Sequence, residues 1–366
     1  MLDPQPAAPG TQYSSDVELL INDRIYAGWE GVSVRRSLDY FASSFDLTLT
    51  DNQAEEARTI KLGSPCQVRI NGDKLITGYV DSIRPGYDAK NRRLTVSGRS
   101  KVADLVDCSL PPGTLGAGQQ NSRTLLQLTT TVGKRFGITA RSEVAGLEPI
   151  QISNLSPEQN IFEFLELHAR MAGVRLSDDP DGNLVISRAS KERVGTALVL
   201  GENIEKGEGE FSDRDRFSEY LILGQRPSKN DDFPETNAHI SGVVKDAAVR
   251  YRPTVVVAEG ALNGPGMAKR RAEWQRNVQY GRSRQANYTV NGWRHKDGLW
   301  QPNTNVLVQD KWMGLTGKDG KGEWLMIGTV EFILDAGGQR TRLTVMPVEA
   351  YDLIPLPQEE ADMGAF

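Results

Sequence analysis

Side chains that could carry out catalysis or hold a metal are few in this sequence, and they stand apart from one another. The three histidines, His168, His239 and His295, occur singly, and the two cysteines, Cys66 and Cys108, form no Cys-x-x-Cys pair. A zinc site needs several such ligands at short spacings, and a catalytic histidine needs a nucleophile or second ligand nearby, so neither is indicated. We favour two reduced cysteines near a core over a single structural disulfide.

Two loops resemble ligand-binding loops in composition only. The acidic segment SDDPDGN at 177–183 lacks the spacing and terminal glutamate of an EF-hand, which favours a hairpin turn at Asp181–Gly182. The segment GKDGKGE at 317–323 has no helix after it, which favours a hairpin tip over a phosphate loop. Motifs of serine hydrolases, zinc proteases and nucleotide-binding proteins are absent from the sequence.

The sequence therefore predicts no enzyme, with no catalytic residue, no cofactor and no metal. Carboxylate pairs such as Glu55–Glu56 and Asp231–Asp232 leave a cell-wall hydrolase as an alternative, because such pairs are not recognisable from spacing. The basic segment Lys269–Arg284 leaves a nucleic-acid-binding module as another. Since the net charge is −5, we favour a helix that packs through Ala268, Ala272 and Trp274.

Two kinds of hydrophobic periodicity divide the chain. Alternating apolar and polar residues predict strands near both ends, and a helical period predicts a different unit between them. We expect one helix from a cap at Ser122 to a stop at Gly137. We expect a second that Ser156 caps and Gly173 ends, with Pro157 at its first position and Gln159 completing a capping box. Their buried residues are expected to be Leu125, Leu128, Val132 and Phe136 in the first helix, and Ile161, Phe162, Leu165 and Ala169 in the second.

The expected fold class is α+β and mainly β, with two similar small antiparallel β-barrel domains and a small α/β domain. No secretory signal and no membrane-spanning segment is expected. The domains are a flexible tail at 1–13, a first barrel at 14–108, the α/β domain at 109–198, a second barrel at 199–228 and 285–352, an insertion with a strand and a basic helix at 229–284, and a flexible acidic tail at 353–366.

A faint internal repeat supports the two barrels. Residues 75–83, LITGYVDSI, match residues 325–333, LMIGTVEFI, and the strand sequence RLTV follows each copy. The match predicts that Val80 and Val330 lie on equivalent faces and that Gly78 and Gly328 mark bulges or sharp bends. Two similar units in one chain would let three chains form a ring of six units.

Several stretches together resemble one family over residues 15–352. GYVDSI and LTVSGRSKVADLVDCS resemble the first barrel of the Mu-like phage tail baseplate hub proteins. SPEQNIFEFLELHARMAGVRLSDDPDGNLVISR is similar to the middle domain of that family. The second half of the family's proteins is similar to five stretches of this chain: LGENI, RFSEYLILGQ, VRYRPTVVVAE, RRAEW and YTVNGWRHKDGLWQPN.

The resemblance implies a homotrimeric ring with pseudo-six-fold symmetry, related in fold to the hub of T-even phages and to the base of type VI secretion spikes. Its implied partners are a central tail spike, the tail tube, and the tape measure and baseplate wedge proteins. DNA would only pass through the lumen, which we expect to be neutral or acidic so that it does not grip phosphates. The implied location is the virion baseplate, after assembly in the host bacterial cytoplasm, with a genome-free injection device as the alternative.

Overall fold

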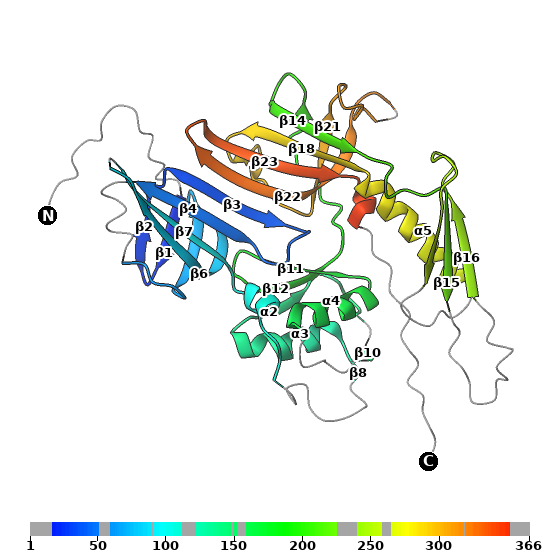
Figure 1. Cartoon of the computed structure of the whole chain (residues 1–366), viewed down its shortest axis with the longest axis horizontal. Helices are drawn as coiled ribbons and strands as arrows, with labels where there is room; N and C mark the ends of the chain where they lie inside the picture. Colours follow the sequence, from blue (N-terminus) through cyan, green and yellow to red (C-terminus); the bar gives the residue numbers. More distant parts are fainter. Residues whose placement is uncertain are drawn as a thin grey trace, which may run out of the picture.

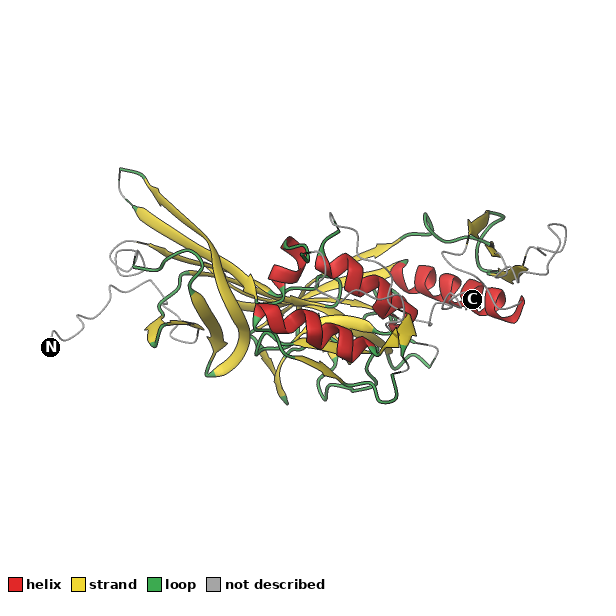
Figure 2. Ribbon diagram, turned by 90° about the horizontal axis from the view of Figure 1, so that it is seen from below, coloured by secondary structure: helices red, strands yellow, loops and turns green. Residues whose placement is uncertain are grey.

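The computed structural model describes residues 17–50, 59–89, 91–111, 122–147, 149–151, 159–224, 240–257, 265–317 and 319–351. Both expected tails, Ser156, Pro157, His239 and the two carboxylate pairs lie outside these residues. The described chain is mainly β, with a large sheet along its length and a small helical unit beneath (Figure 1). Seen from below, the helices of the small unit lie in front of the sheet (Figure 2).

The first β unit contains seven strands, and the alternating sequence pattern explains them. In β1 and β4, for example, every second side chain is buried, which is the burial pattern of a sheet with one face on a core. Neighbours pair antiparallel in the order β3-β4-β7-β6-β5-β1-β2. The strands are β1 (Val17–Ile21), β2 (Arg24–Tyr26), β3 (Gly31–Ser37), β4 (Ser44–Thr50), β5 (Pro65–Ile70), β6 (Asp73–Tyr87) and β7 (Arg92–Ser100).

The middle unit has its own apolar core, formed by three helices against a small sheet. The sheet places β12 between β11 and β9, and the hairpin turn predicted at Asp181–Gly182 is confirmed. The elements are α2 (Ala103–Asp107), β8 (Ser122–Arg123), α3 (Leu125–Gly133), η1 (Lys134–Phe136), β9 (Ala140–Ser142), β10 (Ile150–Gln151), α4 (Ile161–Met171), β11 (Arg175–Asp178) and β12 (Leu184–Ser187).

Both predicted helix starts in this unit were wrong. Ser122 lies in β8, and the capping box of α3 is formed by Thr124 and Gln127. Helix α4 begins at Ile161, where the side chain of Asn160 accepts a hydrogen bond from the amide of Glu163 at 2.8 Å. The sequence offers several polar residues that could cap each helix. Which one does so depends on where the first helical turn begins, and the sequence does not fix that position.

Both predicted helix ends were confirmed, and most of the residues predicted to be buried are buried. Gly137 adopts the left-handed conformation that ends η1, with φ of 64°, and Gly173 follows α4 with φ of 63°. In α4 the fully buried aromatic residue is Phe164, whereas the predicted Phe162 is only half-buried. In the first helix Leu125, Leu128 and Val132 are buried as predicted, and Phe136 is half-buried.

The second β unit lies in residues 198–211 and 284–351. Its strands continue the large sheet in the order β14-β18-β23-β22, with β21 beside β22 and β13 beside β21. The elements are β13 (Leu198–Val199), β14 (Ile204–Phe211), β18 (Arg284–Asn291), β19 (Arg294–His295), β20 (Gly298–Leu299), β21 (Thr304–Gln309), β22 (Glu323–Asp335), β23 (Gly338–Met346) and η3 (Val348–Tyr351).

The inserted segment forms a small sheet covered by a helix, and it corrects one predicted assignment. Strand β15 (Glu219–Gly224), which we expected in the second barrel, pairs with β16 (Ile240–Lys245) and β17 (Pro253–Val257). Helix α5 (Pro265–Arg282) packs on this sheet through Ala268 and Ala272, as predicted. Alternation shows that a strand has one buried face but not which core that face joins, so β15 was assigned by its position in the chain.

The two β units share one strand order. In the first unit β3-β4-β7-β6-β5-β1 are neighbours, and in the second β14-β18-β23-β22-β21-β13 are neighbours in the same succession. The expected repeat is therefore a repeat of topology, and Val80 and Val330 are both buried in the same core. The described strands differ from two separate barrels, because β3 pairs with β22 and joins both units in one sheet of thirteen strands.

The residue-by-residue match of the repeat does not extend to the strand register. Val80 lies opposite Gly98, whereas Val330 lies opposite Leu343. The β6–β7 hairpin pairs out to Tyr87, so it extends further than its counterpart in the second unit. The two hairpins therefore share direction and neighbours but differ in length.

The two matched glycines have different roles. Gly328 is the extra residue of a bulge between β22 and β23, as predicted. The bulges of β6 instead lie at Leu75, opposite β5, and at Asp81, opposite β7, so the predicted bulge at Gly78 was wrong. Gly78 is required by close packing, because a Cβ there would lie 1.8 Å from the carbonyl oxygen of Arg99.

Gly78→Ala should therefore destabilise the protein by about 2 kcal/mol or more, since the added methyl group meets backbone that cannot rotate away. Gly86→Ala is the matched control in the same strand, where a Cβ meets nothing within 4 Å. Urea denaturation at one fixed protein concentration measures both variants. Equal midpoints for the two would show that β6 and β7 do not approach as described.

Candidate functional site: the joint between the two β units

The joint is the place where β22 changes its partner. Residues Thr304–Val308 pair with the first part of β22, up to Ile327, and β3 pairs with the second part, from Thr329 to Leu334. Gly328 lies between the two parts, and its carbonyl oxygen accepts a hydrogen bond from the amide of Leu38 at 2.7 Å. One bulge therefore sets how the two units meet.

Tyr351 closes the joint from the side. A Cβ on Gly328 would lie 1.8 Å from the Tyr351 hydroxyl oxygen, so only glycine leaves room for this ring. The hydroxyl donates to Asp39 at 3.2 Å, and the guanidinium of Arg175 lies 4.9 Å above the ring. Burial raises the pKa of Tyr351 well above its usual value, so the phenol stays a hydrogen-bond donor.

Arg175 brings the middle unit to the same place. It extends from β11 and donates a short hydrogen bond to the carbonyl oxygen of Leu38, at the end of β3. The Asp178 carboxylate, also on β11, accepts from the amide and hydroxyl of Ser43 at 3.0 and 2.9 Å. All three parts of the chain therefore meet around the residues that follow β3.

The face of the sheet opposite the core carries a series of ion pairs that crosses the joint. Glu331 on β22 accepts from Ser33 at 2.8 Å, from Arg35 at 3.4 Å and from Arg342 at 3.0 Å. Further along the sheet Arg84 pairs with Asp46 at 2.7 Å. Arg35, Arg84 and Arg342 on this face are thus held by carboxylates of other strands of the sheet.

A further series of contacts lies in the first unit. Arg99 contacts both Asp81 and Asp107 at 2.6 Å. The hydrogen bonds that Arg99 donates to Asp107 raise the pKa of Arg99 and lower that of Asp107, so both stay charged.

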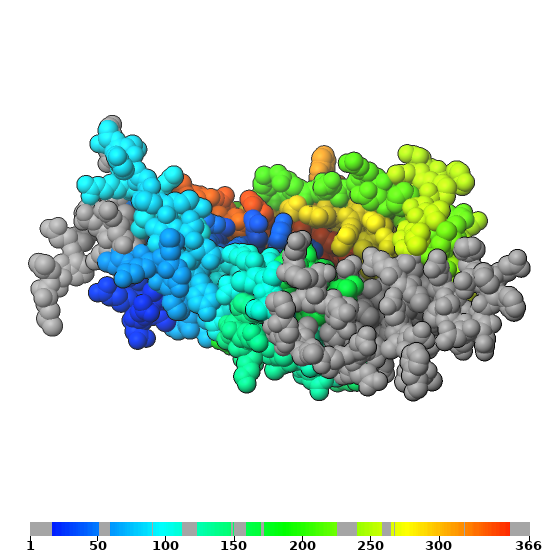
Figure 3. All heavy atoms as spheres, turned by 60° about the horizontal axis from the view of Figure 1, so that its bottom comes forward, coloured from blue at the N-terminus to red at the C-terminus, as the bar shows by residue number. Residues whose placement is uncertain are grey.

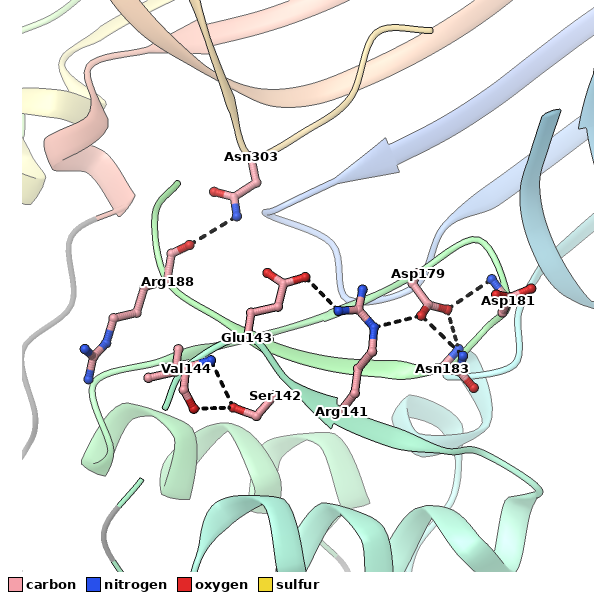
Figure 4. Close-up of polar contacts among 9 residues, drawn as sticks. All are labelled: Arg141, Ser142, Glu143, Val144, Asp179, Asp181, Asn183, Arg188 and Asn303. Atoms are coloured by element: carbon pink, nitrogen blue, oxygen red, sulfur yellow. Dashed lines mark hydrogen bonds and ion pairs between the residues drawn. The ribbon is translucent and has the colours of Figure 1, made fainter. Parts of the chain in front are cut away.

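A polar cavity of about 520 Å³ lies between the middle unit and the joint (Figure 4). Arg141 crosses one wall and pairs with Glu143 at 2.8 Å and with Asp179 at 3.1 Å. On the opposite wall the side chain of Asn303 donates to the carbonyl oxygen of Arg188 at 3.1 Å. The contacts of Arg141 join β9 to the turn after β11, and that of Asn303 joins the end of β12 to the start of β21. The cavity is therefore a seam between units.

Arg36 lines this cavity and was missed by sequence reasoning. It is 7% exposed, and its Nε atom has no hydrogen-bond partner. Burial lowers the pKa of Arg36, and the nearby carboxylates of Asp178 and Asp179 partly offset that effect. The sequence did contain a signal, because Arg36 follows the buried Val32 and Val34 at every second position of β3.

The acidic loop at 177–183 and the glycine-rich loop at 317–323 are both turns. Asp178 bonds Ser43, Asp181 pairs with Lys74, and Asp179 accepts from the amides of its own turn. The carboxylates of the acidic loop are thus used within the fold. Residues of the glycine-rich loop lie between β21 and β22, with Gly322 bonded to the carbonyl of Thr316, which confirms the hairpin tip.

The single histidines and cysteines are not brought together. His168 is fully buried on α4, where it contacts the Phe164 carbonyl at 2.7 Å and burial lowers its pKa. Cys66 and Cys108 are free thiols, and burial raises the pKa of Cys66 to about 12. Cys66 is therefore protonated at neutral pH and weakly nucleophilic.

Within the described ranges, no group of three or more His, Cys, Asp and Glu side chains is arranged to hold a metal. The helices of these ranges include none long and apolar enough to cross a membrane.

Family models match three parts of the chain. The N-terminal domain of the Mu phage baseplate assembly protein GpP-like matches residues 16–100. The second domain of the baseplate hub protein gp44-like matches residues 102–188, and the fourth domain of the Mu phage baseplate assembly protein GpP matches residues 264–354.

Solved structures share the whole fold. A 43 kDa tail protein of prophage MuSo2 from Shewanella oneidensis is 36% identical, with a TM-score of 0.80 over 92% of this chain and 99% of that chain. The E. coli protein c3393, a type VI secretion component described as structurally similar to the T4 tail proteins gp27 and gp5, is 12% identical, with a TM-score of 0.54 over 95% of this chain and 79% of that one. Fold and joint thus define a phage tail protein with the gp27-like hub fold.

The family is narrower than this class. The baseplate hub protein gp44 of Escherichia phage Mu is 30% identical over 356 residues, which cover 94% of this chain and 91% of that protein. The chain belongs to the family of the Mu baseplate hub protein gp44. It is a structural hub protein of a Mu-like contractile phage tail, a component of the virion's baseplate, and not an enzyme.

Tyr351→Ala should destabilise the protein by about 3 kcal/mol, because it leaves a cavity beside Gly328 and removes the partner of Asp39 and Arg175. Tyr251→Ala is the matched control, since Tyr251 is 82% exposed and should change stability by less than about 0.5 kcal/mol. Thermal and urea unfolding measure both. Indistinguishable variants would show that Tyr351 does not support the joint.

Proposed function

We propose that three copies of this chain close into a ring of six similar β units, which adapts a three-fold tail spike to the six-fold tail tube. One observation carries the proposal. The first and second units have the same strand order, and the β3–β22 joint already forms one unit-to-unit contact within the chain. Repeating that contact between chains produces a cyclic assembly of alternating units.

The ring would also form part of the DNA conduit. The sheet face with the ion pairs runs across both units without interruption, which suits it to line a lumen. Glu331 holds Arg35 and Arg342, and Asp46 holds Arg84. A wall whose arginines are neutralised by neighbouring carboxylates does not gain affinity from phosphate contacts, so DNA can slide past it.

The remaining partners follow from the family. The proposed ring meets the spike on one face and the tube on the other, and the tape measure and wedge proteins are further candidates. Assembly in the host bacterial cytoplasm remains part of this proposal. So does the expected division into domains, except that β15 belongs to the inserted segment and not to the second β unit. A genome-free injection device is the alternative, and it would use the same ring.

The oligomeric state tests the ring directly. Light scattering across micromolar concentrations should show a species of about three times the 40.4 kDa chain mass. A protein that stays monomeric at every concentration would contradict the proposal.

The charge balance of the conduit is tested by DNA binding. The double variant Asp46→Asn with Glu331→Gln should bind double-stranded DNA more tightly than the unmodified chain, with a steeper dependence on salt, because arginines on the conduit face lose their carboxylates. The pair Glu192→Gln with Asp319→Asn changes net charge equally at exposed positions off this face, and should have little effect. Tight, steeply salt-dependent binding by the unmodified chain would overturn a neutral conduit and favour the nucleic-acid-binding alternative.

A further inference from the structure

We infer that adjacent copies join by strand addition, with β14 of one copy pairing antiparallel with the outer edge of the distal half of β6 in the next. The inference rests on the proposed ring and names the two edges that close it. Within the chain, β3 of the first unit pairs with the distal half of β22 in the second. By strand order β14 corresponds to β3, and β6 corresponds to β22.

Both corresponding edges are open among the described strands. Strand β14 pairs on one side with β18, and no described strand pairs with its other side. Strand β6 pairs with β5 only up to Tyr79, and Gly63 and Ser64 hold the backbone of Val80. From Ser82 to Tyr87, β6 pairs with β7 alone.

The two edges are also unusually exposed for strands of a large sheet. Seven of the eight residues of β14 are exposed, and Phe211 at its end is 46% exposed. Tyr87 at the end of β6 is 88% exposed. Except at Pro85, which has no N–H, an uncovered edge offers unpaired backbone groups to another strand. Addition of a second copy would also cover both aromatic residues.

The charges on the two edges are complementary. The central charge of the proposed contact is positive, whereas the central charge of the internal joint is negative. Inside the chain, a carboxylate lies between two arginines, because Glu331 is held by Arg35 and Arg342. Between copies, Arg84 would be the central charge, with Asp46 on one side at 2.7 Å and the glutamates of β14 on the other. Arg84 is 60% exposed, so it can take a second partner.

Glu208 and Arg84 lie on the same face of the sheet, because directly paired residues share a face and side chains alternate along each strand. Glu208 lies opposite Asn287, and this row continues through Thr344, Thr329 and Ser37 on the face with the ion pairs. Arg84 lies opposite Thr95, which pairs with Thr48 on the same face of the first unit. Strand addition thus continues the face proposed to line the conduit.

One copy cannot make this contact with itself. Six strands lie between β14 and β6 in the sheet, a path of roughly 30 Å at about 4.8 Å per strand. The space-filling view agrees, because the cyan atoms around residues 80–100 project at one end of the molecule, away from the green atoms of β14 (Figure 3).

Cysteine cross-linking tests the pairing. In a Cys108→Ser background, the variants are Lys206→Cys on β14 and Gly86→Cys on β6, and Cys66 is buried. They keep Arg84 and the β14 glutamates, and Lys206→Cys frees Glu208 from its partner at 2.6 Å. A bismaleimide with a reach of about 10 Å, roughly two strand spacings, tolerates the exact register. We expect covalent dimers and closed trimers on a denaturing gel.

The matched control replaces Lys206→Cys by Lys321→Cys, at the exposed hairpin tip of the second unit. Light scattering on the same samples separates the two proposals. If the protein is a trimer and the test and control cysteine pairs cross-link equally, or neither cross-links, the β14–β6 pairing is wrong and the proposed ring still stands. A monomer without cross-links would overturn both. Covalent ladders beyond the trimer would support the pairing and contradict a closed ring of three.

Charge reversal provides a second measurement that does not depend on cysteine chemistry. Arg84→Glu should raise the concentration at which half the chains are trimeric by tenfold or more. Adding Glu208→Arg should restore most of that loss, because the opposite charges again face each other across the joint. Failure of the second change to restore assembly, with both variants folded by circular dichroism, would contradict this arrangement.

Discussion

The backbone contact at Gly328 is the constraint on which the rest of this structure depends. There β22 leaves β21 and pairs with β3, and the amide of Leu38 bonds the Gly328 carbonyl at 2.7 Å. Because the Tyr351 ring occupies the space that a side chain would need, the bulge has room for glycine alone. The relation of the two units is therefore set by hydrogen-bonded strands instead of a linker.

A joint of this kind determines what the surface can do. The sheet continues from one unit to the next, so the face opposite the core also continues, with Glu331 shared by strands of both units. The Arg84–Asp46 pair on this face is exposed, and an exposed ion pair adds little to folding stability. The larger effect of the ion pairs on this face is on the local field, since they leave a wall that is polar but nearly balanced in charge, which suits the inside of a tail.

Much of the local structure could be predicted from the sequence, and the failures share one cause. Alternation predicted the strands, including β15, but not that β15 pairs with β16 and packs under α5. The repeat predicted two related units, but not their register, in which Val80 and Val330 have different partners. Arg36 and Tyr351 were missed because their importance comes from neighbours far away in the chain.

The sequence by itself determined the mainly β character of this protein, its helical middle unit, the presence of a short internal repeat and most of the residues that belong to cores. These follow from side-chain periodicity and turn chemistry, which act between residues close in the chain. Only the tertiary structure decided that two units become one sheet, since Ser33 meets Glu331 across a separation of 298 residues. Which edges meet depends on the shape and charge of whole strands, and no local pattern encodes that choice.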